Sequence, residues 1–427
     1  MTVSSSPSVP RSGRASVTSG GPVVDPAAPV PASAVVNPAA PVPASASVPA
    51  PAAPVARPLR PYVSELVLTA FARHRRTEVR LGTLTLLAGP SGSGKSSALR
   101  AYEALARLAG GAELGEVFRE PGAWVPEGAR PDAQGRRGFR IGCAADGPEG
   151  PVRLEVAVQA EPELRIVGER LTADGVVLLG SALRDPRRRV VQAAWHTAGA
   201  EVTRGLLPDD RLGTALLPLR VAGTTPGQRR VLAAAEQMLV ALRSVFACDP
   251  RPDRMGEPVP VGTGRLLGGC DNLAAVLART RVECGRRHGL LVDALREGCA
   301  GPVADLLAEP CGDGRVRALL DRGNGIRTGI ERLGDGELRH LALALVLLTG
   351  PGVLEVDAAG EVPDALQTLT VLADNFDRGL DPAQRAALLE LAVRMCARGH
   401  IRLVGAVSEA SWAAGVDGVT VVHLDRD

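Results

Sequence analysis

The chain has 427 residues, of which 45% are hydrophobic, so it can bury one large core or two modest ones. A formal net charge of +2 gives no global field typical of a nucleic-acid or membrane binder. Seven scattered cysteines without a C-x-x-C pair exclude the patterns of a disulfide framework or a zinc site. We expect a cytoplasmic protein without a membrane segment, because no apolar stretch approaches the roughly 20 residues that span a bilayer.

Residues 1–58 consist largely of Pro, Ala, Ser and Val and contain a near-repeat, residues 25–36 followed by 37–48. This composition cannot bury enough apolar surface to offset the entropy of ordering, and its prolines favour extended backbone. We therefore predict a disordered tail over residues 1–58 and one folded domain over residues 59–427. A role of the tail as a proline-rich ligand stays open as the less favoured alternative.

The folded part begins with two predicted strands, residues 62–71 and 77–89, and the second leads directly into a glycine-rich loop. Residues 96–108 follow as a predicted helix, because their apolar positions recur at helical spacing. Residues 137–222 contain short β-type runs separated by Gly, Pro and Asp. These runs predict an antiparallel β subdomain.

The remainder of the chain alternates between helical and extended patterns. Residues 226–247, 271–298, 337–350 and 382–399 are predicted helices, the first two too short for long coiled-coil arms. Residues 367–374, 400–408 and 418–424 are predicted strands. Such alternation predicts an α/β fold of the P-loop type, with a mostly parallel core sheet flanked by helices.

The glycine-rich loop predicts a nucleotide site. Its residues are Gly89, Pro90, Ser91, Gly92, Ser93, Gly94, Lys95, Ser96 and Ser97. Successive backbone N–H groups of such a loop converge on a phosphate at the start of the following helix. Lys95 would bridge the β and γ phosphates, and Ser96 would bind Mg²⁺. Lys95 is also the only lysine in the chain, which fits a position where a compact ammonium group is needed. We therefore predict binding of a nucleoside triphosphate, with ATP and Mg²⁺ as cofactors.

A second motif lies in the C-terminal half, where Gly334, Asp335, Gly336 and Glu337 open an apolar helix. This segment resembles the signature motif of ABC-type ATPases, most closely the RecF/SMC branch. The resemblance implies that the segment binds the γ phosphate of ATP held by the other subunit of a dimer. It therefore predicts an ATP-dependent homodimer.

Two further stretches share this resemblance, which extends over roughly residues 60–425. Residues 369–382 align with the family's Walker B strand and D-loop, and residues 268–277 are similar to a segment between its two lobes. The alignment implies that Asp374 binds Mg²⁺. Asp357, at the end of another apolar run, is the alternative acid, but the spacing from Asp374 to the D-loop fits the family better.

Three residues depart from the family pattern. Gly334 stands in place of the signature serine, Asn375 in place of the glutamate that polarises the attacking water, and Val407 where a histidine is expected. Losing each such group typically costs on the order of 10²-fold in rate. We therefore expect slow or absent hydrolysis, with Asp374, Asn375 and Asp377 as the candidate catalytic residues. Asp377 or Asp381 could serve as a substitute base.

Alternative functions stay open on the sequence alone. A non-catalytic, ATP-dependent interaction module would share all the binding motifs. A P-loop kinase or other phosphotransferase acting on a small molecule would need the phosphate loop but no signature helix. DNA is a further candidate ligand of the arginine clusters at residues 73–76, 136–140 and 184–189, although a solvated surface is the favoured interpretation in so arginine-rich a chain.

Overall fold

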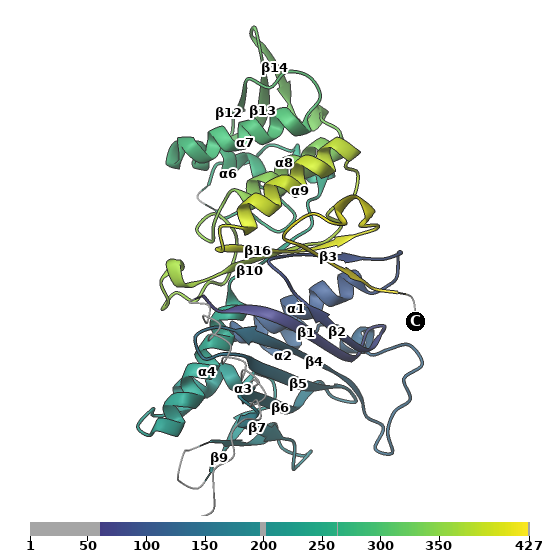
Figure 1. Ribbon diagram of the computed structural model, residues 1–427, viewed down its shortest axis with the longest axis vertical. Coiled ribbons are helices and arrows are strands. Elements are labelled where there is room, and N and C mark those ends of the chain that lie inside the picture. The colour runs from purple at the N-terminus through teal and green to yellow at the C-terminus, as the bar shows by residue number, and fades with distance from the viewer. Residues whose placement is uncertain (1–59, 197–201, 263, 426–427) are drawn as a thin grey trace, which may run out of the picture. The chain divides into compact units, whose positions relative to one another are not determined.

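A computed structural model describes residues 60–196, 202–262 and 264–425. The tail predicted for residues 1–58 lies outside these residues. Every described residue belongs to one unit, Val55–Asp427. Helices and strands are mixed along this unit, as the sequence predicts, and the strands form three sheets (Figure 1).

One of the three sheets is parallel throughout, in the strand order β10-β15-β16-β3-β17. Its strands are β3 (Leu84–Ala88), β10 (Val245–Cys248), β15 (Leu369–Ala373), β16 (Ile401–Val407) and β17 (Val419–His423). Every residue of β3, β15 and β16 is buried, as expected for strands that are covered on both faces. The predicted parallel core sheet is therefore present.

This sheet separates two apolar cores. Leu86 of β3 packs into one core and its neighbour Leu87 into the other, because successive side chains of a strand point to opposite faces. Figure 1 shows α8 (Asp335–Leu347) and α9 (Pro382–Cys396) over one face and α1 (Lys95–Ala109) over the other. The helix that follows the phosphate loop thus packs on the opposite side from the helix that follows the signature segment.

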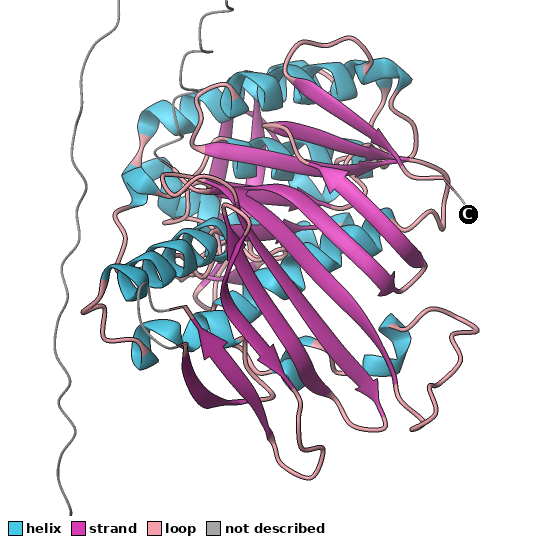
Figure 2. Ribbon diagram, turned by 60° about the horizontal axis from the view of Figure 1, so that its bottom comes forward, coloured by secondary structure: helices cyan, strands magenta, loops and turns pink. Residues whose placement is uncertain are grey.

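The second sheet is antiparallel, with the order β2-β1-β4-β5-β6-β7-β8-β9 (Figure 2). Its strands are β1 (Tyr62–Phe71), β2 (His74–Arg80), β4 (Arg137–Asp146), β5 (Val152–Glu161), β6 (Arg165–Ala173), β7 (Val176–Ala182), β8 (Val190–Trp195) and β9 (Thr203–Pro208). The antiparallel pairing predicted for residues 137–222 is confirmed from β4 to β9. The sheet also includes β1 and β2, which precede the phosphate loop in sequence.

The prediction of a single strand over residues 77–89 is wrong. The segment contains β2 and β3, which belong to different sheets and are separated by a turn at residues 81–83. At this turn, a Cβ on Gly82 would collide with the hydroxyl of Thr420, so a larger residue would have to displace that side chain of β17. Gly82 N also donates a hydrogen bond to Thr85 Oγ1 at 2.9 Å, which closes the turn.

Two helix predictions are corrected, one at its end and one at its middle. The helix expected over residues 226–247 is α4 (Pro226–Arg243), because the residues that follow pair with β15 as β10. The helix expected over residues 271–298 is two helices, α6 (Leu273–Glu283) and α7 (Gly285–Gly298). They are separated at Cys284, whose φ of −153° is extended rather than helical.

The third sheet was not predicted from the sequence. It consists of β11 (Val259–Pro260), β12 (Asp305–Pro310), β13 (Arg315–Gly323) and β14 (Ile326–Gly329), all paired in antiparallel fashion. The remaining helices are α2 (Leu114–Val117), α3 (Gly213–Arg220) and α5 (Pro252–Met255). Figure 1 shows this sheet beyond α6, α7 and α8, at the end of the unit away from the antiparallel sheet.

The burial of α8 generates a stability prediction. Leu345 is fully buried in this helix, so Leu345→Ala leaves a cavity and should lower the free energy of unfolding by about 2–5 kcal/mol. Leu219 of α3 is 80% exposed, and Leu219→Ala should change it by less than about 0.5 kcal/mol. Urea denaturation of both variants measures the difference, and equal effects would contradict the packing described for α8.

Candidate functional site

The glycine-rich loop lies between β3 and α1 and is braced by β2. Gly92 and Gly94 have φ values of 82° and 97°, the left-handed region that favours glycine. His74 Nε2 donates a hydrogen bond to Gly94 O at 3.0 Å, and a Cβ on Gly94 would lie 2.6 Å from the same nitrogen. Arg73 Nη1 donates to Gly92 O. Gly94 therefore lies where His74 of β2 approaches the loop closely.

Lys95 begins α1, and its ammonium group lies over the loop. Its Nζ donates hydrogen bonds to Gly89 O at 2.7 Å and Pro90 O at 3.0 Å. Partial burial lowers the pKa of Lys95, while the nearby carboxylates of Asp377 and Asp374 oppose this shift by raising it. The lysine is thus held between the loop and two acidic groups from the C-terminal half of the chain.

The loop is joined to Asp374 by a direct hydrogen bond. Ser96 Oγ donates to Asp374 Oδ1 at 3.0 Å, and the backbone N–H of Asn375 donates to the same oxygen at 3.0 Å. Asp374 follows the last residue of β15, which is separated from β3 by one strand, β16. The alternative acid, Asp357, lies outside the strands and pairs with Arg243 at 3.3 Å. Of the two acids, the structure places Asp374 at the loop.

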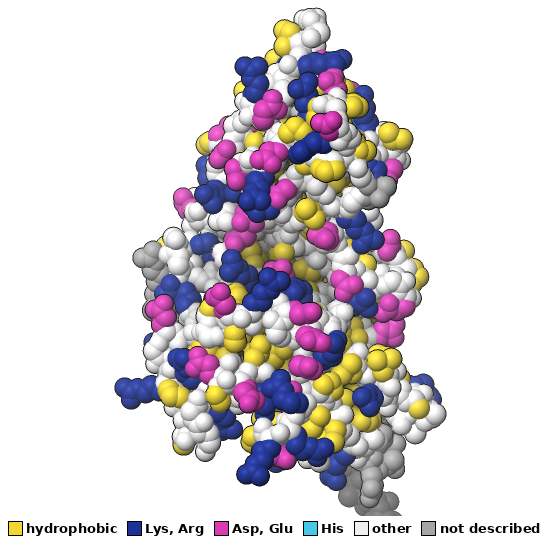
Figure 3. Space-filling model, turned by 180° about the vertical axis from the view of Figure 1, so that it is seen from behind, with side chains coloured by type: hydrophobic (Ala, Val, Ile, Leu, Met, Phe, Trp, Pro, Cys, Tyr) yellow, Lys and Arg dark blue, Asp and Glu magenta, His cyan; other side chains and the backbone are white. Residues whose placement is uncertain are grey.

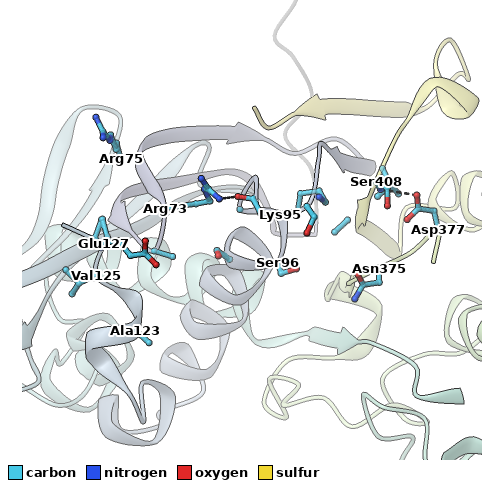
Figure 4. A pocket seen from close by; sticks show the side chains of 18 residues that line it. Arg73, Arg75, Lys95, Ser96, Ala123, Val125, Glu127, Asn375, Asp377 and Ser408 are labelled. Carbon is cyan, nitrogen blue, oxygen red and sulfur yellow. Dashed lines mark hydrogen bonds between the residues drawn. The ribbon is translucent and has the colours of Figure 1, made fainter. Parts of the chain in front are cut away.

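A cavity of about 660 Å³ opens beside the loop (Figure 4). This volume falls in the range of typical small-molecule sites. Its walls come from four parts of the chain: the loop with the start of α1, the turn between β1 and β2, the segment before β4, and the ends of β15 and β16. The lining residues are Ala72, Arg73, Arg75, Ser91, Gly92, Gly94, Lys95, Ser96, Ser97, Ala123, Val125, Pro126, Glu127, Asn375, Asp377, Ala406, Val407 and Ser408.

The candidate catalytic residues are only partly brought together around this cavity. Asn375 and Asp377 line it, and Asp377 Oδ2 accepts a hydrogen bond from Ser408 N at 2.9 Å. Val407, where the sequence resemblance led us to expect histidine, also lines it. Asp381 does not line it. Its Oδ1 accepts a hydrogen bond from Gln384 N at 2.8 Å as the N-cap of α9, so it is already engaged elsewhere.

The signature segment, Gly334 to Glu337, does not line the cavity of its own chain. Gly334 is the N-cap of α8, and its N–H donates to Glu337 Oε2 at 2.9 Å. Glu337 Oε1 accepts a second hydrogen bond from Ala300 N at 2.8 Å. The structure therefore separates the predicted binding residues into two groups, one at the phosphate loop and one at the start of α8.

Two parts of the cavity wall were missed by the sequence analysis. They are the turn at residues 72–75, noted only as an arginine cluster, and the segment at residues 123–127. The available signal was the aromatic content near that segment. Only 2% of the chain is aromatic, yet three aromatic residues gather here. The ring of Trp124 stacks on that of Phe71 with centroids 5.2 Å apart, and the ring centroids of Phe118 and Trp124 are 6.1 Å apart.

Four of the ten arginines in the clusters that suggested DNA contacts pair with acidic side chains. On the face shown in Figure 3, arginine and acidic side chains are interspersed rather than segregated. Such mixing gives little of the single-sign field that attracts DNA phosphates. The ion pairs are Arg76 with Glu78, Arg136 with Asp132, Arg137 with Glu161, and Arg189 with Glu163 and Asp209.

Within the described residues, no group of three or more His, Cys, Asp or Glu side chains could hold a metal ion by itself. Every helix in this part of the chain is too short or too polar to cross a bilayer. An ion at Ser96 and Asp374 would therefore need further ligands from a bound molecule or water.

The chain is similar to several solved structures of SMC head domains, the group whose motifs the sequence resembles. One, an SMC head bound to the C-winged helix domain of ScpA, is 13% identical with a TM-score of 0.48, covering 85% of this chain and 94% of that one. The SMC head from Thermotoga maritima is 12% identical with a TM-score of 0.37, covering 83% and 92%.

A third is an SMC head with an extended coiled coil, bound to the C-terminal domain of ScpA derived from Pyrococcus furiosus. It is 11% identical with a TM-score of 0.45, and the match covers 85% of this chain and 93% of that one. No protein-family model and no curated protein matches the chain. At such low identities and TM-scores, the likeness by itself assigns no function to this chain.

The packing of the signature segment generates a prediction that compares two of its glycines. A Cβ on Gly336 would collide with the backbone of Gly379 and lie 2.8 Å from Gln384 Oε1, so Gly336→Ala should lower the free energy of unfolding by about 1–3 kcal/mol. A Cβ on Gly334 would lie 3.8 Å from its nearest neighbour, Glu337 Oε2, which is an ordinary contact. Serine is also a preferred N-cap residue. Gly334→Ser should therefore leave stability unchanged or raise it. Thermal unfolding of both variants measures this, and a Gly336→Ala protein as stable as the parent would contradict the close approach.

Proposed function

We propose that this protein binds a nucleoside triphosphate together with Mg²⁺, with ATP as the expected nucleotide. The observation that carries the proposal is the hydrogen bond between Ser96 and Asp374, because Ser96 lines, together with Lys95, a cavity large enough for a nucleotide. Glycines with left-handed backbone precede a helix N-terminus at the same place, which is the arrangement that binds phosphate.

The residues at this point fit a magnesium ion. Ser96 and Asp374 offer only oxygen atoms, the ligand type that Mg²⁺ prefers, and their oxygens already lie 3.0 Å apart. Mg²⁺ usually keeps several waters and shares phosphate oxygens with the protein. When bound, the ion would neutralise charge on the phosphates. Ser96 and Asp374 would hold it, and Lys95 would contact the phosphates from the loop side.

We further propose that the site is completed by a second copy of the chain. The start of α8 is a helix N-terminus with glycine-rich backbone, which suits an anion. It lies outside its own cavity, so within one chain it cannot contact a nucleotide bound at Lys95. A partner copy that presents its Gly334–Glu337 segment to this cavity would use both groups of residues, and bound nucleotide would then favour the dimer.

The same site is poorly equipped for hydrolysis. Asn375 lines the cavity but its amide cannot take up a proton from water, and Val407 offers no polar group. Asp377 is a carboxylate that lines the cavity near Lys95 and can accept a proton. In slow hydrolysis, water would attack the γ phosphorus, the bond to the β-γ bridging oxygen would break, and Asp377 would accept the proton from water. We therefore propose a nucleotide-driven switch with low turnover.

Binding and dimerisation are tested by Lys95→Ala. Loss of its charge-assisted hydrogen bonds should weaken ATP-Mg²⁺ binding about tenfold to a hundredfold and abolish an ATP-dependent shift from monomer to dimer. Calorimetry and sizing with and without ATP-Mg²⁺ measure both. Arg76→Ala is the matched control, because it removes a cation from β2 outside the cavity lining.

Two outcomes would count against parts of this proposal. Equal ATP affinity in the parent and Lys95→Ala proteins would reject the phosphate site. If ATP binding depended on Lys95 but the protein stayed a monomer, the dimer would be rejected. If, in addition, phosphate left ATP only when an acceptor was added, a phosphotransferase would be favoured.

Hydrolysis is tested at position 375. The parent protein should release phosphate at less than about 1 s⁻¹, and Asn375→Glu should raise the rate about a hundredfold by restoring a proton acceptor. Asp377→Asn should lower the residual parental rate. Phosphate release at saturating ATP-Mg²⁺ gives all three values. Fast turnover in the parent would overturn the low-activity proposal, and an unchanged rate in Asp377→Asn would remove Asp377 from it.

A further inference from the structure

The cavity has a wall, residues 123–127, that no phosphate-loop motif accounts for. It is held by aromatic packing in a chain with only three Trp, two Tyr and five Phe residues. Trp124 stacks on Phe71 with an interplanar angle of 13°, and Phe118 and Phe139 pack edge-on with centroids 5.1 Å apart. Ala72 N also donates a hydrogen bond to Trp124 O at 2.6 Å. The wall is therefore fixed to the β1–β2 turn.

The surface that this wall presents is apolar apart from one carboxylate. Ala123, Val125 and Pro126 are its apolar residues in the cavity lining, and the adjoining turn adds Ala72, Arg73 and Arg75. Glu127 also lines it, is exposed, and makes no hydrogen bond or ion pair with any described residue. An apolar surface beside an unpaired acceptor suits a flat ring that carries a hydrogen-bond donor on its edge.

The position of the wall relative to the phosphate loop indicates which part of a nucleotide would reach it. Figure 4 shows Asn375, Asp377 and Ser408 on one side of Lys95 and Glu127 on the other. If the terminal phosphate faces the acidic side, where Asp374 and Asp377 approach Lys95, the nucleoside must extend toward Glu127. The wall then lies where the base would be.

We propose that residues 123–127 form the base-binding face of this site and that Glu127 accepts a hydrogen bond from the exocyclic amine of a purine. This inference rests on the proposed nucleotide binding and adds its specificity. A carboxylate only accepts hydrogen bonds, so it discriminates bases by their donors. Adenine offers its N6 amine, and guanine offers its N2 amine beside N1–H. Both supply the same chemistry, which the unsubstituted purine ring and hypoxanthine lack at those positions.

Two matched nucleotide pairs test the inference. ATP and purine riboside triphosphate differ by the N6 amine, and GTP and ITP differ by the N2 amine. For one pair, the amine-bearing member should bind the parent protein about tenfold more tightly, because a hydrogen bond to a charged group is lost without it. That pair identifies the base. Arg75, which also lines the cavity, would contact base acceptors that both members of a pair share, so its contribution cancels in the ratio.

The decisive variant is Glu127→Ala, which should reduce the tenfold ratio to about one. It should leave the affinity for inorganic tripolyphosphate with Mg²⁺ unchanged, because that ligand has no base. Glu120→Ala removes a carboxylate from the same part of the chain outside the cavity lining, and it should keep the parental ratio. Calorimetry in the presence of Mg²⁺ gives each dissociation constant.

The outcomes separate this inference from the proposed function. The role of Glu127 is overturned if the two nucleotides of each pair bind the parent equally, or if their affinity ratio is unchanged in Glu127→Ala. In either case, tripolyphosphate binding that depends on Lys95 would still support the phosphate site. An equal loss of the ratio in Glu120→Ala also overturns it, because the effect would then be general electrostatics. Absence of any Lys95-dependent binding of tripolyphosphate or nucleotides overturns both proposals.

Discussion

The hydrogen bond between Ser96 and Asp374 is the constraint on which the site depends. It joins residues 278 positions apart in the chain, so it exists only because the parallel sheet brings β3 and β15 to the same edge. With β16 between them, the carboxyl ends of all three strands meet beside the start of α1. The sheet can hold this order because both of its faces are covered by separate apolar cores. The site is therefore formed by two segments that are distant in sequence, the glycine-rich loop after β3 and Asp374 after β15.

The sequence predicted those elements whose signal is local. The phosphate loop, the helix after it and the buried strand β15 each show their pattern within about ten residues, and each was placed correctly. The errors occurred where strand pairing decided the structure. Residues 77–89 look like one extended run, but the turn at Gly82 sends its halves to different sheets. The last residues of the helix predicted over residues 226–247 form strand β10 instead, because they pair with β15.

The same distinction applies to the site. The roles of Lys95, Ser96 and Asp374 can be proposed from motif chemistry, and the structure brings these three together. The position of Glu127 could not be predicted, because it depends on how Trp124 stacks on the β1–β2 turn. Aromatic side chains bury large areas with defined geometry, so their gathering in an aromatic-poor chain marks a segment whose position matters. That inference needs the three-dimensional contacts as well as the composition.

The amide of Asn375 has a consequence for the proposed nucleotide binding as well as for the proposed rate of hydrolysis. In the proposed nucleotide complex, a carboxylate at this position would lie near the terminal phosphate and repel it, since two like charges at 4 Å interact by about 4 kcal/mol at an effective dielectric constant of 20. Asparagine removes that repulsion together with the proton acceptor. Bound triphosphate is then favoured at the same time as its hydrolysis is disfavoured. In the proposed function, such a site suits a long-lived nucleotide-bound state better than rapid turnover, because asparagine at position 375 would stabilise the occupied form and slow its conversion.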